Sequence, residues 1–196
     1  MSRLKFLPDE RLAQLKPTLD EHIQQVAESI TPENFNQLAD VLIRHVLETG
    51  VRLARAHDIL VWLVDETKEH LVPCYGVGPI GRRLILKHKQ PLREGIVSMV
   101  MMSEQPFIEN EVYKHQSHSK IVDDMLRQRT YAMIVVPFYF VRQCRGVISC
   151  VQVKSSRMTE PDPPGFGQEH LIALQRSSTL LTELIDYRLL KQSIYW

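Results

Sequence analysis

Three cysteines carry the side chains best suited to nucleophilic or redox chemistry: Cys74, Cys144 and Cys150. Their number is odd and no two stand at the spacing of a redox or metal-binding pair, so we expect reduced thiols in a cytoplasmic protein. Cys144 stands between Arg142 and Arg145, and nearby positive charge lowers the pKa of a thiol and favours the nucleophilic thiolate. Cys74 and Cys150 are predicted to be small core residues. Cys144 is therefore the candidate for a thiol-based activity.

Two histidines, His115 and His118, are three residues apart, which would place both imidazoles on one face of a helix. A structural zinc site needs two further ligands, and the sequence offers none at a recognisable spacing. The polar run around the histidines, residues 114–118, also fits a solvated loop. We therefore predict no metal site.

Other catalytic patterns do not stand out in the sequence. There is no recognisable Ser/His/Asp set and no pair of catalytic carboxylates. Gly76, Gly78 and Gly81 stand close together but precede no convincing helix, so they do not match a dinucleotide fingerprint. We expect a protein that is not an enzyme, with a thiol activity at Cys144 as the alternative.

The composition limits the kind of fold that can hold these residues in place. The chain has 196 residues, of which 44% are hydrophobic and 24% charged, with a formal net charge of +1. These values are ordinary for a globular protein with one sizeable core. Lysine and arginine are spread along the chain and no apolar run reaches the length of a membrane span, so neither nucleic acid nor a membrane is expected as a partner.

Helices are predicted at both ends of the chain. Apolar residues spaced by three and four indicate a helix over residues 12–30, which Pro17 either kinks or starts. Thr31, Pro32 and Glu33 look like the capped start of a second helix that runs to about residue 57. The last helix is predicted over residues 168–187 and continues toward residue 190.

Strands are predicted between these helices. Residues 59–64 and 70–75 read as one hairpin around a polar turn, and residues 84–86 as a short strand. A short helix over residues 95–103 and an extended piece at 107–108 follow. Residues 131–141 and 146–153 form a second hairpin with a turn over residues 142–145. Antiparallel hairpins with helices segregated to the ends predict an α+β fold whose sheet is covered on one face.

The same order resembles the GAF domain, a small-molecule sensing module, over residues 36–190. The segments that carry the resemblance are residues 65–72, Gly95 with Val100 and Pro106, residues 129–137, residues 146–148, and Phe166 with Glu169. The resemblance implies a GAF-like antiparallel sheet with terminal helices packed on one face and a ligand-pocket lid on the other. The PAS fold is the main alternative. The implied domain covers residues 32–192, with a helical extension over residues 1–31 and a tail over 193–196.

The resemblance also implies a binding site. The lid would comprise residues 95–102 and 113–129, and the pocket would combine apolar walls with a few orienting polar groups. The candidate ligand-binding residues are Tyr75, His115, Asp123, Arg129, Tyr131, Ser149 and Gln152. Each also has a structural interpretation. Side chains on strands can face the terminal helices, and Arg129 can pair with Asp123 or Asp124.

The ligand class stays open, and the cofactor is unknown. Cyclic-nucleotide relatives carry an Asn-Lys, Phe, Asp-Glu pattern that is degenerate here, with Gln152, Phe166 and Glu169 at the corresponding places. Haem would take His115 or His118 as axial ligand. Covalent bilin is not expected, since residues 82–142 contain no cysteine. Relatives that reduce free methionine sulfoxide place catalytic cysteines in the lid, where this chain has none.

The resemblance implies a sensory or regulatory small-molecule-binding domain of a signalling system. GAF domains commonly dimerise through their first and last helices, so we expect a homodimer through the terminal helices, acting on a separate output protein or within a longer sensor. The alternative is a structural dimerisation or protein-interaction module whose pocket is filled by its own side chains. Methionine fills irregular space well, and the lid supplies Met99, Met101, Met102 and Met125.

Overall fold

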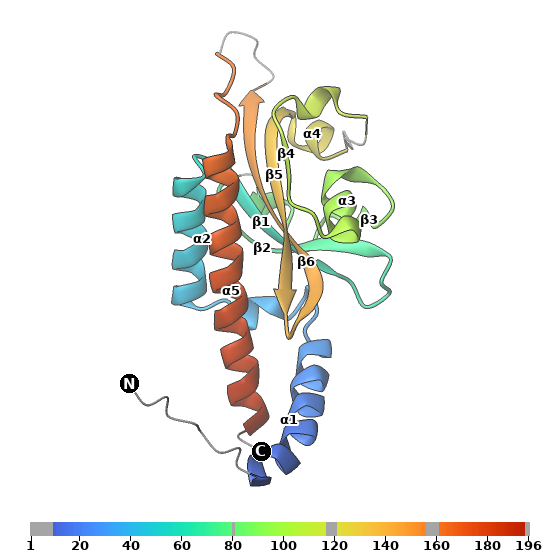
Figure 1. Cartoon of the computed structure of the whole chain (residues 1–196). Coiled ribbons are helices and arrows are strands. Elements are labelled where there is room, and N and C mark those ends of the chain that lie inside the picture. Colours follow the sequence, from blue (N-terminus) through green and yellow to red (C-terminus); the bar gives the residue numbers. More distant parts are fainter. Residues whose placement is uncertain (1–9, 80, 117–120, 156–160, 195–196) are drawn as a thin grey trace, which may run out of the picture.

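The computed structural model describes residues 10–79, 81–116, 121–155 and 161–194, and within these ranges six strands form one antiparallel sheet (Figure 1). The strand order is β3-β2-β1-β6-β5-β4. The strands are β1 (Asp58–Val64), β2 (His70–Val77), β3 (Gln90–Pro91), β4 (Phe107–Glu109), β5 (Gln128–Phe140) and β6 (Gln143–Ser155). Both predicted hairpins are confirmed, as β1–β2 and β5–β6.

The turn of the first hairpin is organised by Asp65. Its carboxylate accepts hydrogen bonds from Thr67 Oγ1 at 2.8 Å and from the backbone N–H groups of Glu69 and His70, both at 3.2 Å. An aspartate that bonds the backbone a few residues ahead favours a turn over a continued strand. The Asp65 side chain therefore holds the polar turn between the two strands in place.

The turn of the second hairpin is shorter than predicted. Phe140 pairs with Gln143, so the turn consists of Val141 and Arg142 and not of residues 142–145. Both turn residues have positive φ, 50° and 61°. A two-residue turn needs this left-handed backbone to match the twist of its strands. The pairing reaches the turn after an irregularity between Phe138 and Tyr139, at which Arg145 has no partner in the register.

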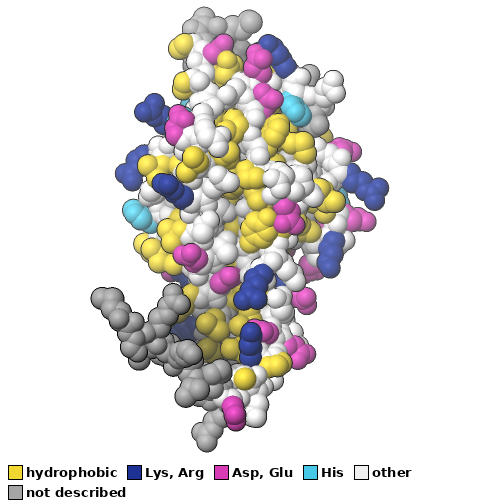
Figure 2. All heavy atoms as spheres, in the orientation of Figure 1, with side chains coloured by type: hydrophobic (Ala, Val, Ile, Leu, Met, Phe, Trp, Pro, Cys, Tyr) yellow, Lys and Arg dark blue, Asp and Glu magenta, His cyan; other side chains and the backbone are white. Residues whose placement is uncertain are grey.

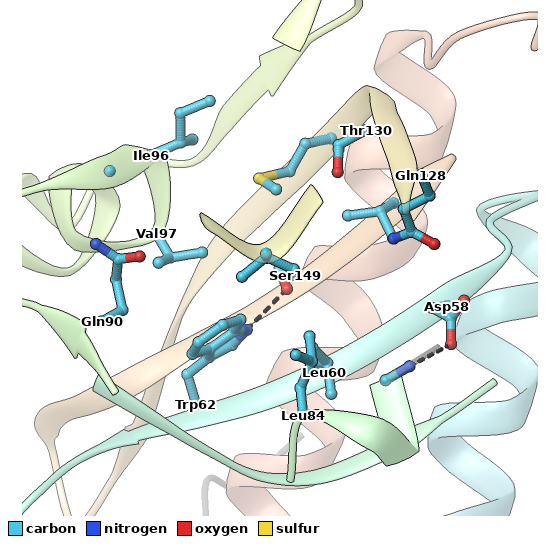
Figure 3. A pocket seen from close by; sticks show the side chains of 15 residues that line it. Asp58, Leu60, Trp62, Leu84, Gln90, Ile96, Val97, Gln128, Thr130 and Ser149 are labelled. Carbon is cyan, nitrogen blue, oxygen red and sulfur yellow. Dashed lines mark hydrogen bonds between the residues drawn. The ribbon is translucent and has the colours of Figure 1, made fainter. Parts of the chain in front are cut away.

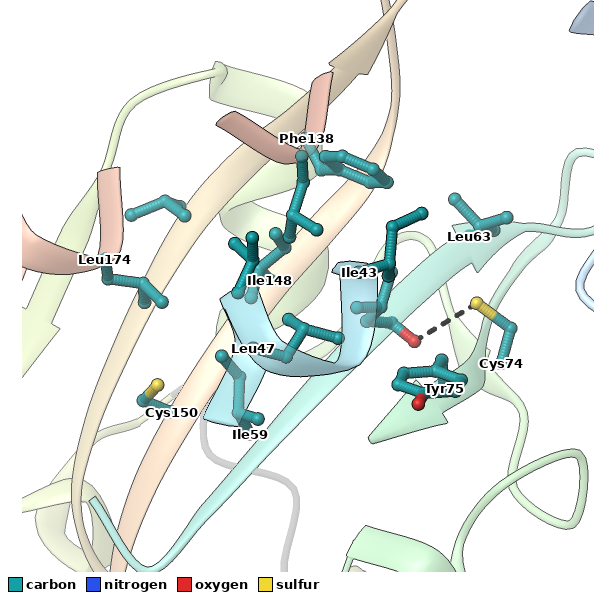
Figure 4. Packing of buried hydrophobic residues seen from close by; sticks show 14 of the residues in the cluster. Ile43, Leu47, Ile59, Leu63, Cys74, Tyr75, Phe138, Ile148, Cys150 and Leu174 are labelled. Carbon is teal, nitrogen blue, oxygen red and sulfur yellow. Dashed lines mark hydrogen bonds between the residues drawn. The ribbon is translucent and has the colours of Figure 1, made fainter. Parts of the chain in front are cut away.

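Helices α2 (Val41–Leu53) and α5 (Gln168–Ile194) cover one face of the sheet (Figure 1). Ile43 and Leu47 from α2 and Leu174 from α5 meet Ile59 and Ile148 from the sheet in the main core (Figure 4). All five side chains are fully buried. The apolar residues whose spacing predicts the last helix therefore form the stripe that packs against the sheet.

The predicted helix start at Thr31 is wrong. Asn34 accepts a hydrogen bond from Thr31 N at 2.9 Å and donates one to Ser29 O at 2.7 Å, which closes a loop before the short helix η1 (Phe35–Gln37). Helix α2 begins only at Val41, because the Asp40 carboxylate caps it by accepting from the N–H groups of Leu42 at 2.9 Å and Ile43 at 3.1 Å.

Helix α1 (Glu10–Glu28) contains Pro17 in its interior and lies against α5 where α5 runs past the sheet (Figure 1). Ala27 is fully buried and Ile23 is half-buried, whereas Leu15 is 62% exposed. The half of α1 nearer the sheet is thus packed, and the part of its apolar stripe around Leu15 is open to solvent.

The opposite face of the sheet carries α3 (Gly95–Ser103), α4 (Ile121–Leu126) and the short helices η2 (Gly81–Arg83) and η3 (Val112–Lys114). The helix predicted over residues 95–103 is confirmed. The strand predicted at residues 84–86 is wrong: Leu84 N bonds Gly81 O at 2.9 Å and Leu86 has a positive φ of 58°, so the segment is a turn whose Leu84 is buried.

Two side-chain amides fasten the segment that leads into α5. Asn110, after β4, donates to Phe166 O at 3.0 Å and accepts from Phe166 N at 2.7 Å. Gln152, on β6, accepts from Gly165 N at 2.9 Å and donates to Arg55 O at 3.0 Å. An amide that donates and accepts can replace a strand partner for an irregular segment. The segment before α5 is therefore fixed to the residue that follows the edge strand β4 and to the central strand β6.

Charged groups are mixed on the surface. On the face shown in Figure 2, lysine and arginine side chains alternate with aspartate and glutamate around a middle in which hydrophobic and neutral side chains predominate. None of the helices within the described ranges is both long and apolar enough to span a bilayer.

Candidate functional site

A cavity of about 70 Å³ lies between the sheet and helix α3, on the face away from α2 and α5 (Figure 3). Its walls are mainly apolar and come from β1, β3, β5, β6, η2, α3 and α4. The apolar lining residues are Leu60, Trp62, Leu84, Ile96, Val97, Val122, Met133 and Val151. The polar ones are Asp58, Gln90, Gln128, Thr130 and Ser149. An apolar pocket with a few polar groups is the usual form of a small-molecule site.

Trp62 and Ser149 form the central polar contact of this cavity. Ser149 pairs with Leu60, so Trp62 on the same face of β1 is its diagonal neighbour across the strands. Trp62 Nε1 donates to Ser149 Oγ at 2.8 Å, and both side chains are buried (Figure 3). Ser149 uses its oxygen as acceptor here, so its own hydroxyl proton remains available to a ligand.

Asp58 and the glycine loop close one end of the cavity. Asp58 is 1% exposed, and its Oδ1 accepts from Gly81 N at 2.8 Å. A Cβ added at Gly78, which has a φ of +121°, would lie 2.1 Å from the same oxygen. Gly78 and Gly81 therefore allow the backbone to approach the Asp58 carboxylate, whereas Gly76 lies against Leu60 and Ile59 O.

Asp123 stands directly behind a residue of the cavity wall. It accepts from Thr130 N at 3.0 Å and from Thr130 Oγ1 at 2.6 Å. Both residues are buried, at 7% and 4% exposed. The pair attaches α4 to the start of β5. Because the Thr130 hydroxyl donates its proton to Asp123, its oxygen can still accept a hydrogen bond.

Gln90 and His88 support the wall beside Trp62. Gln90 Nε2 donates to Glu94 O at 2.8 Å, and Gly95 with φ +84° begins α3 against this amide. The His88 ring packs edge-on against Trp62 at 6.0 Å between centroids. Burial lowers the pKa of His88 and favours the neutral imidazole, although a hydrogen bond with Gln90 opposes the shift.

Of the seven predicted ligand-binding residues, Ser149 lines the cavity and Asp123 lies behind Thr130. Gln152 is 1% exposed and its amide is used to hold the segment before α5. Tyr75 belongs to the core on the opposite face, where its hydroxyl accepts from Arg44 Nε at 3.2 Å beside a separate depression of about 430 Å³.

The remaining three predicted residues lie outside the cavity wall. Arg129 stacks on Tyr113, with its guanidinium carbon 3.7 Å from the ring centroid, and the Tyr113 ring is 5.9 Å from that of Tyr131. The half-buried His115 packs edge-on against Phe107 at 5.6 Å. Contact with a ligand stays a prediction for all seven residues.

Sequence reasoning missed most of the cavity wall. Leu60 and Trp62 belong to the apolar run that predicts a strand over residues 59–64, whereas Asp58 and Thr130 each stand one residue before a predicted strand. The signal that could have found them is alternation, because Asp58, Leu60 and Trp62 occupy every second position of one strand and therefore share a face.

The expectation of a low thiol pKa at Cys144 is wrong. Burial raises the pKa of this thiol to about 11, and the nearby Glu104 carboxylate adds to the effect. Its sulfur lies 3.5 Å from Gly146 O and 3.7 Å from Met101 Sδ. Cys144 belongs to β6, and its flanking arginines do not offset the desolvation of the thiolate. Burial also raises the pKa values of Cys74 and Cys150, which are core residues as predicted.

Within the ranges that the structure describes, no group of three or more histidine, cysteine, aspartate or glutamate side chains could hold a metal ion. His118, one of the two histidines considered as metal or haem ligands, lies outside the described residues.

Comparison with known proteins gives structural matches only. No protein-family model matches the sequence, and no curated protein does. The GAF domain of a phosphoenolpyruvate-protein phosphotransferase (ptsP) from Coxiella burnetii matches 89% of this chain and 96% of its own, with a TM-score of 0.60 and 14% identity. The second GAF domain of DevS from Mycobacterium smegmatis matches 77% of this chain and 96% of its own, with a TM-score of 0.57 and 15% identity.

The free methionine-R-sulfoxide reductase from Neisseria meningitidis, solved in complex with its substrate, matches 98% of this chain and 99% of its own, with a TM-score of 0.55 and 17% identity. Together with the sheet order and the two helical layers, these similarities define the fold. It is that of a GAF domain, which confirms the resemblance predicted from the sequence.

Proposed function

We propose that this protein is a sensory or regulatory domain of a signalling system, which binds a small molecule in the cavity between the sheet and α3. The observation that carries the proposal is the cavity itself, with apolar walls, the Ser149 hydroxyl and the side chains of Gln128 and Thr130. The structural similarity to GAF domains, one of them from DevS, and to residues 122 to 287 of a methyl-accepting chemotaxis protein supports the signalling role.

The volume of the cavity limits the size of the ligand that can bind in it. At about 70 Å³ it would hold roughly five water molecules, at 10–15 Å³ each. Drug-sized ligands occupy pockets of about 300–1,000 Å³. Cyclic nucleotides and haem, which the sequence left open, are therefore several times too large unless α3 moves away from the sheet. The closed state favours a ligand of a few non-hydrogen atoms.

The test is a native mass spectrum of the purified protein, repeated after denaturation. Extra mass that is lost on denaturation would identify a bound small molecule. Val97→Leu fills part of the cavity and should reduce the bound fraction, whereas Met102→Leu on the same helix, at a side chain that is 71% exposed, should not. Bound mass that survives Val97→Leu unchanged would remove this cavity as the site.

A second candidate function is a structural interaction module without a ligand. The small volume of the cavity favours it, because about 70 Å³ is far below the volume of a usual ligand pocket. A protein with no bound mass, whose thermal stability rises with Val97→Leu, would support this alternative, since filling an empty cavity stabilises a fold.

The proposed assembly is a homodimer through the terminal helices, which acts on a separate output protein. On α5, Ile172, Leu180 and Tyr187 are spaced by about two helical turns and are 40%, 45% and 67% exposed. A stripe of this kind needs a partner surface. Leu180→Glu should shift sedimentation toward the monomer, and Ile121→Glu, at an exposed position on α4 across the sheet, should not.

A further inference from the structure

Three side chains of α5 bond the backbone of β5 and of the turn that follows it, one for each helical turn. The bonds run from Ser178 Oγ to Pro137 O (3.1 Å), from Thr182 Oγ1 to Tyr139 O (2.7 Å), and from Val141 N to Asp186 Oδ1 (2.7 Å). Helix and strand run in the same direction here, since both sets of numbers increase together.

The series is possible because four residues of the helix and two residues of the strand cover nearly the same length. Four residues of an α-helix advance about 6 Å. Two residues of an antiparallel strand advance about 6.8 Å. The difference is under about 1 Å per step, so three successive bonds can form before the two repeats fall out of phase.

These carbonyl groups are open to the helix because the neighbouring strand is short. β4 pairs with β5 only at Met133–Val135, so beyond Val135 the outer edge of β5 has no strand partner within the described residues. A buried strand edge must satisfy its polar groups in another way. Helix α5 does so with its side chains.

Other hydroxyls of α5 behave differently. A serine or threonine inside a helix commonly donates to the carbonyl four residues back. Ser177 and Thr179 follow this rule, with bonds to Ala173 O and Gln175 O, each 3.1 Å. Ser178 and Thr182 instead donate to the sheet. The helix therefore carries two hydroxyls that bond within the helix and two that bond to β5.

The series ends at a backbone that is held under strain. Val141 and Arg142 both have positive φ in a two-residue turn, a position that normally takes asparagine and glycine. Both polar backbone groups of Val141 are bound by the terminal helices: its N–H donates to Asp186, and its carbonyl accepts from Gln24 Nε2 of α1 at 3.3 Å. Strained backbone persists only where surrounding contacts fix it.

We propose that Ser178, Thr182 and Asp186 form a register lock that fixes α5 along the β5–β6 hairpin and so transmits changes at the cavity to the terminal helices. The proposal rests on the proposed sensory function and adds the positioning residues through which it acts. Apolar packing by Leu181 and Ile185 is non-directional, whereas hydrogen bonds specify one axial position of the helix.

The same two strands connect the lock with the cavity. Thr130 and Met133 of β5 and Ser149 and Val151 of β6 line the cavity, and the hairpin continues from there to the turn at Val141. A displacement of the hairpin at the cavity therefore moves the carbonyls to which α5 is bound. By reciprocity, release of α5 must alter the cavity end.

The experiment needs no ligand and uses the full chain with Trp196→Phe, so that Trp62 is the remaining tryptophan. Thr182→Val combined with Asp186→Ala breaks the lock with little change in volume at residue 182. Thr179→Val is the matched control for a local hydroxyl. Asp186→Asn keeps an acceptor oxygen for Val141 N and should behave as the parent does.

Two measurements report on the cavity end. We expect amide exchange in the first half of β5 to become about fivefold faster in the double variant, and acrylamide quenching of Trp62 to increase, with α2 unchanged as an internal reference. In the reverse direction, Val97→Leu in the cavity should change the exchange of the Val141 and Arg142 amides. Thr182→Val alone should give the same changes in smaller measure.

Faster exchange confined to the turn, with Trp62 and the first half of β5 unchanged in both lock variants, would overturn the proposal. Equal effects of Thr179→Val and Thr182→Val would do so as well. A lack of bound mass in the native spectrum would count against the sensory function but would leave these measurements interpretable. The two proposals therefore fail separately.

Discussion

The bond between Trp62 and Ser149 allows a quantitative test of the cavity wall. The indole N–H donates to the serine oxygen at 2.8 Å, with the two residues only 5% and 3% exposed. Ser149→Ala removes the acceptor and leaves a buried N–H without a partner, which costs about 1–3 kcal/mol. We expect a loss of about 2 kcal/mol, or about 4–8 °C in melting temperature for a domain of this size.

A double-mutant cycle separates this bond from the change in packing. In a Trp62→Phe background the donor is absent, so Ser149→Ala should cost only about 0.5 kcal/mol, which gives a coupling energy of about 1.5 kcal/mol. Urea unfolding followed by far-ultraviolet circular dichroism measures all four proteins without relying on tryptophan emission. Equal costs of Ser149→Ala in both backgrounds would refute the reasoning and indicate that water from the adjacent cavity replaces the serine oxygen.

Two further predictions concern charged states. Burial holds the pKa of Cys144 at about 11, so only about one thiol in ten thousand is ionised at pH 7. Iodoacetamide should therefore alkylate Cys144 far more slowly in the native protein than in the unfolded chain. Mass spectrometry of the modified peptide measures both rates. The hydrogen bond from Arg188 lowers the pKa of Asp40 from 3.8 to about 2, so the Asp40 carboxylate stabilises the fold above pH 3.8 and loses this effect as the pH falls through about 2. Asp40→Ala should cost about 1 kcal/mol at neutral pH through the lost helix cap and flatten the stability curve in that acidic range, and an unchanged curve would contradict the assignment.

The hairpins and the last helix could be predicted because their signals are local. The apolar run of β1 ends at a polar turn, and the stripe of Leu174 and Leu181 follows one helix face. The start of α2 could not be predicted in the same way, because both Thr31 and Asp40 can cap a helix. Only the bonds of Asn34 to Ser29 and Thr31 decide between them.

Bulges explain why two of the seven candidate residues, Tyr75 and Tyr131, lie away from the cavity wall. One extra residue in a strand changes the face of every side chain beyond it. The pairing of β2 with β1 skips Cys74, so Tyr75 faces α2 and not the cavity. The pairing of β5 with β6 skips Tyr131. No sequence pattern marks either bulge, whereas Ser149 lies in a regular stretch.

The attachment of α5 has a mechanical consequence. Its leading segment is fastened at Gly165 and Phe166, its middle by Ser178 and Thr182, and Arg188 is bonded to Leu38 O and the Asp40 carboxylate. A rod anchored at so many points along its length can neither slide nor spin by itself. Any motion of the helix would therefore carry the hairpin with it as one rigid unit. The last turn of α5, which lies beyond the sheet, would then move the farthest (Figure 1).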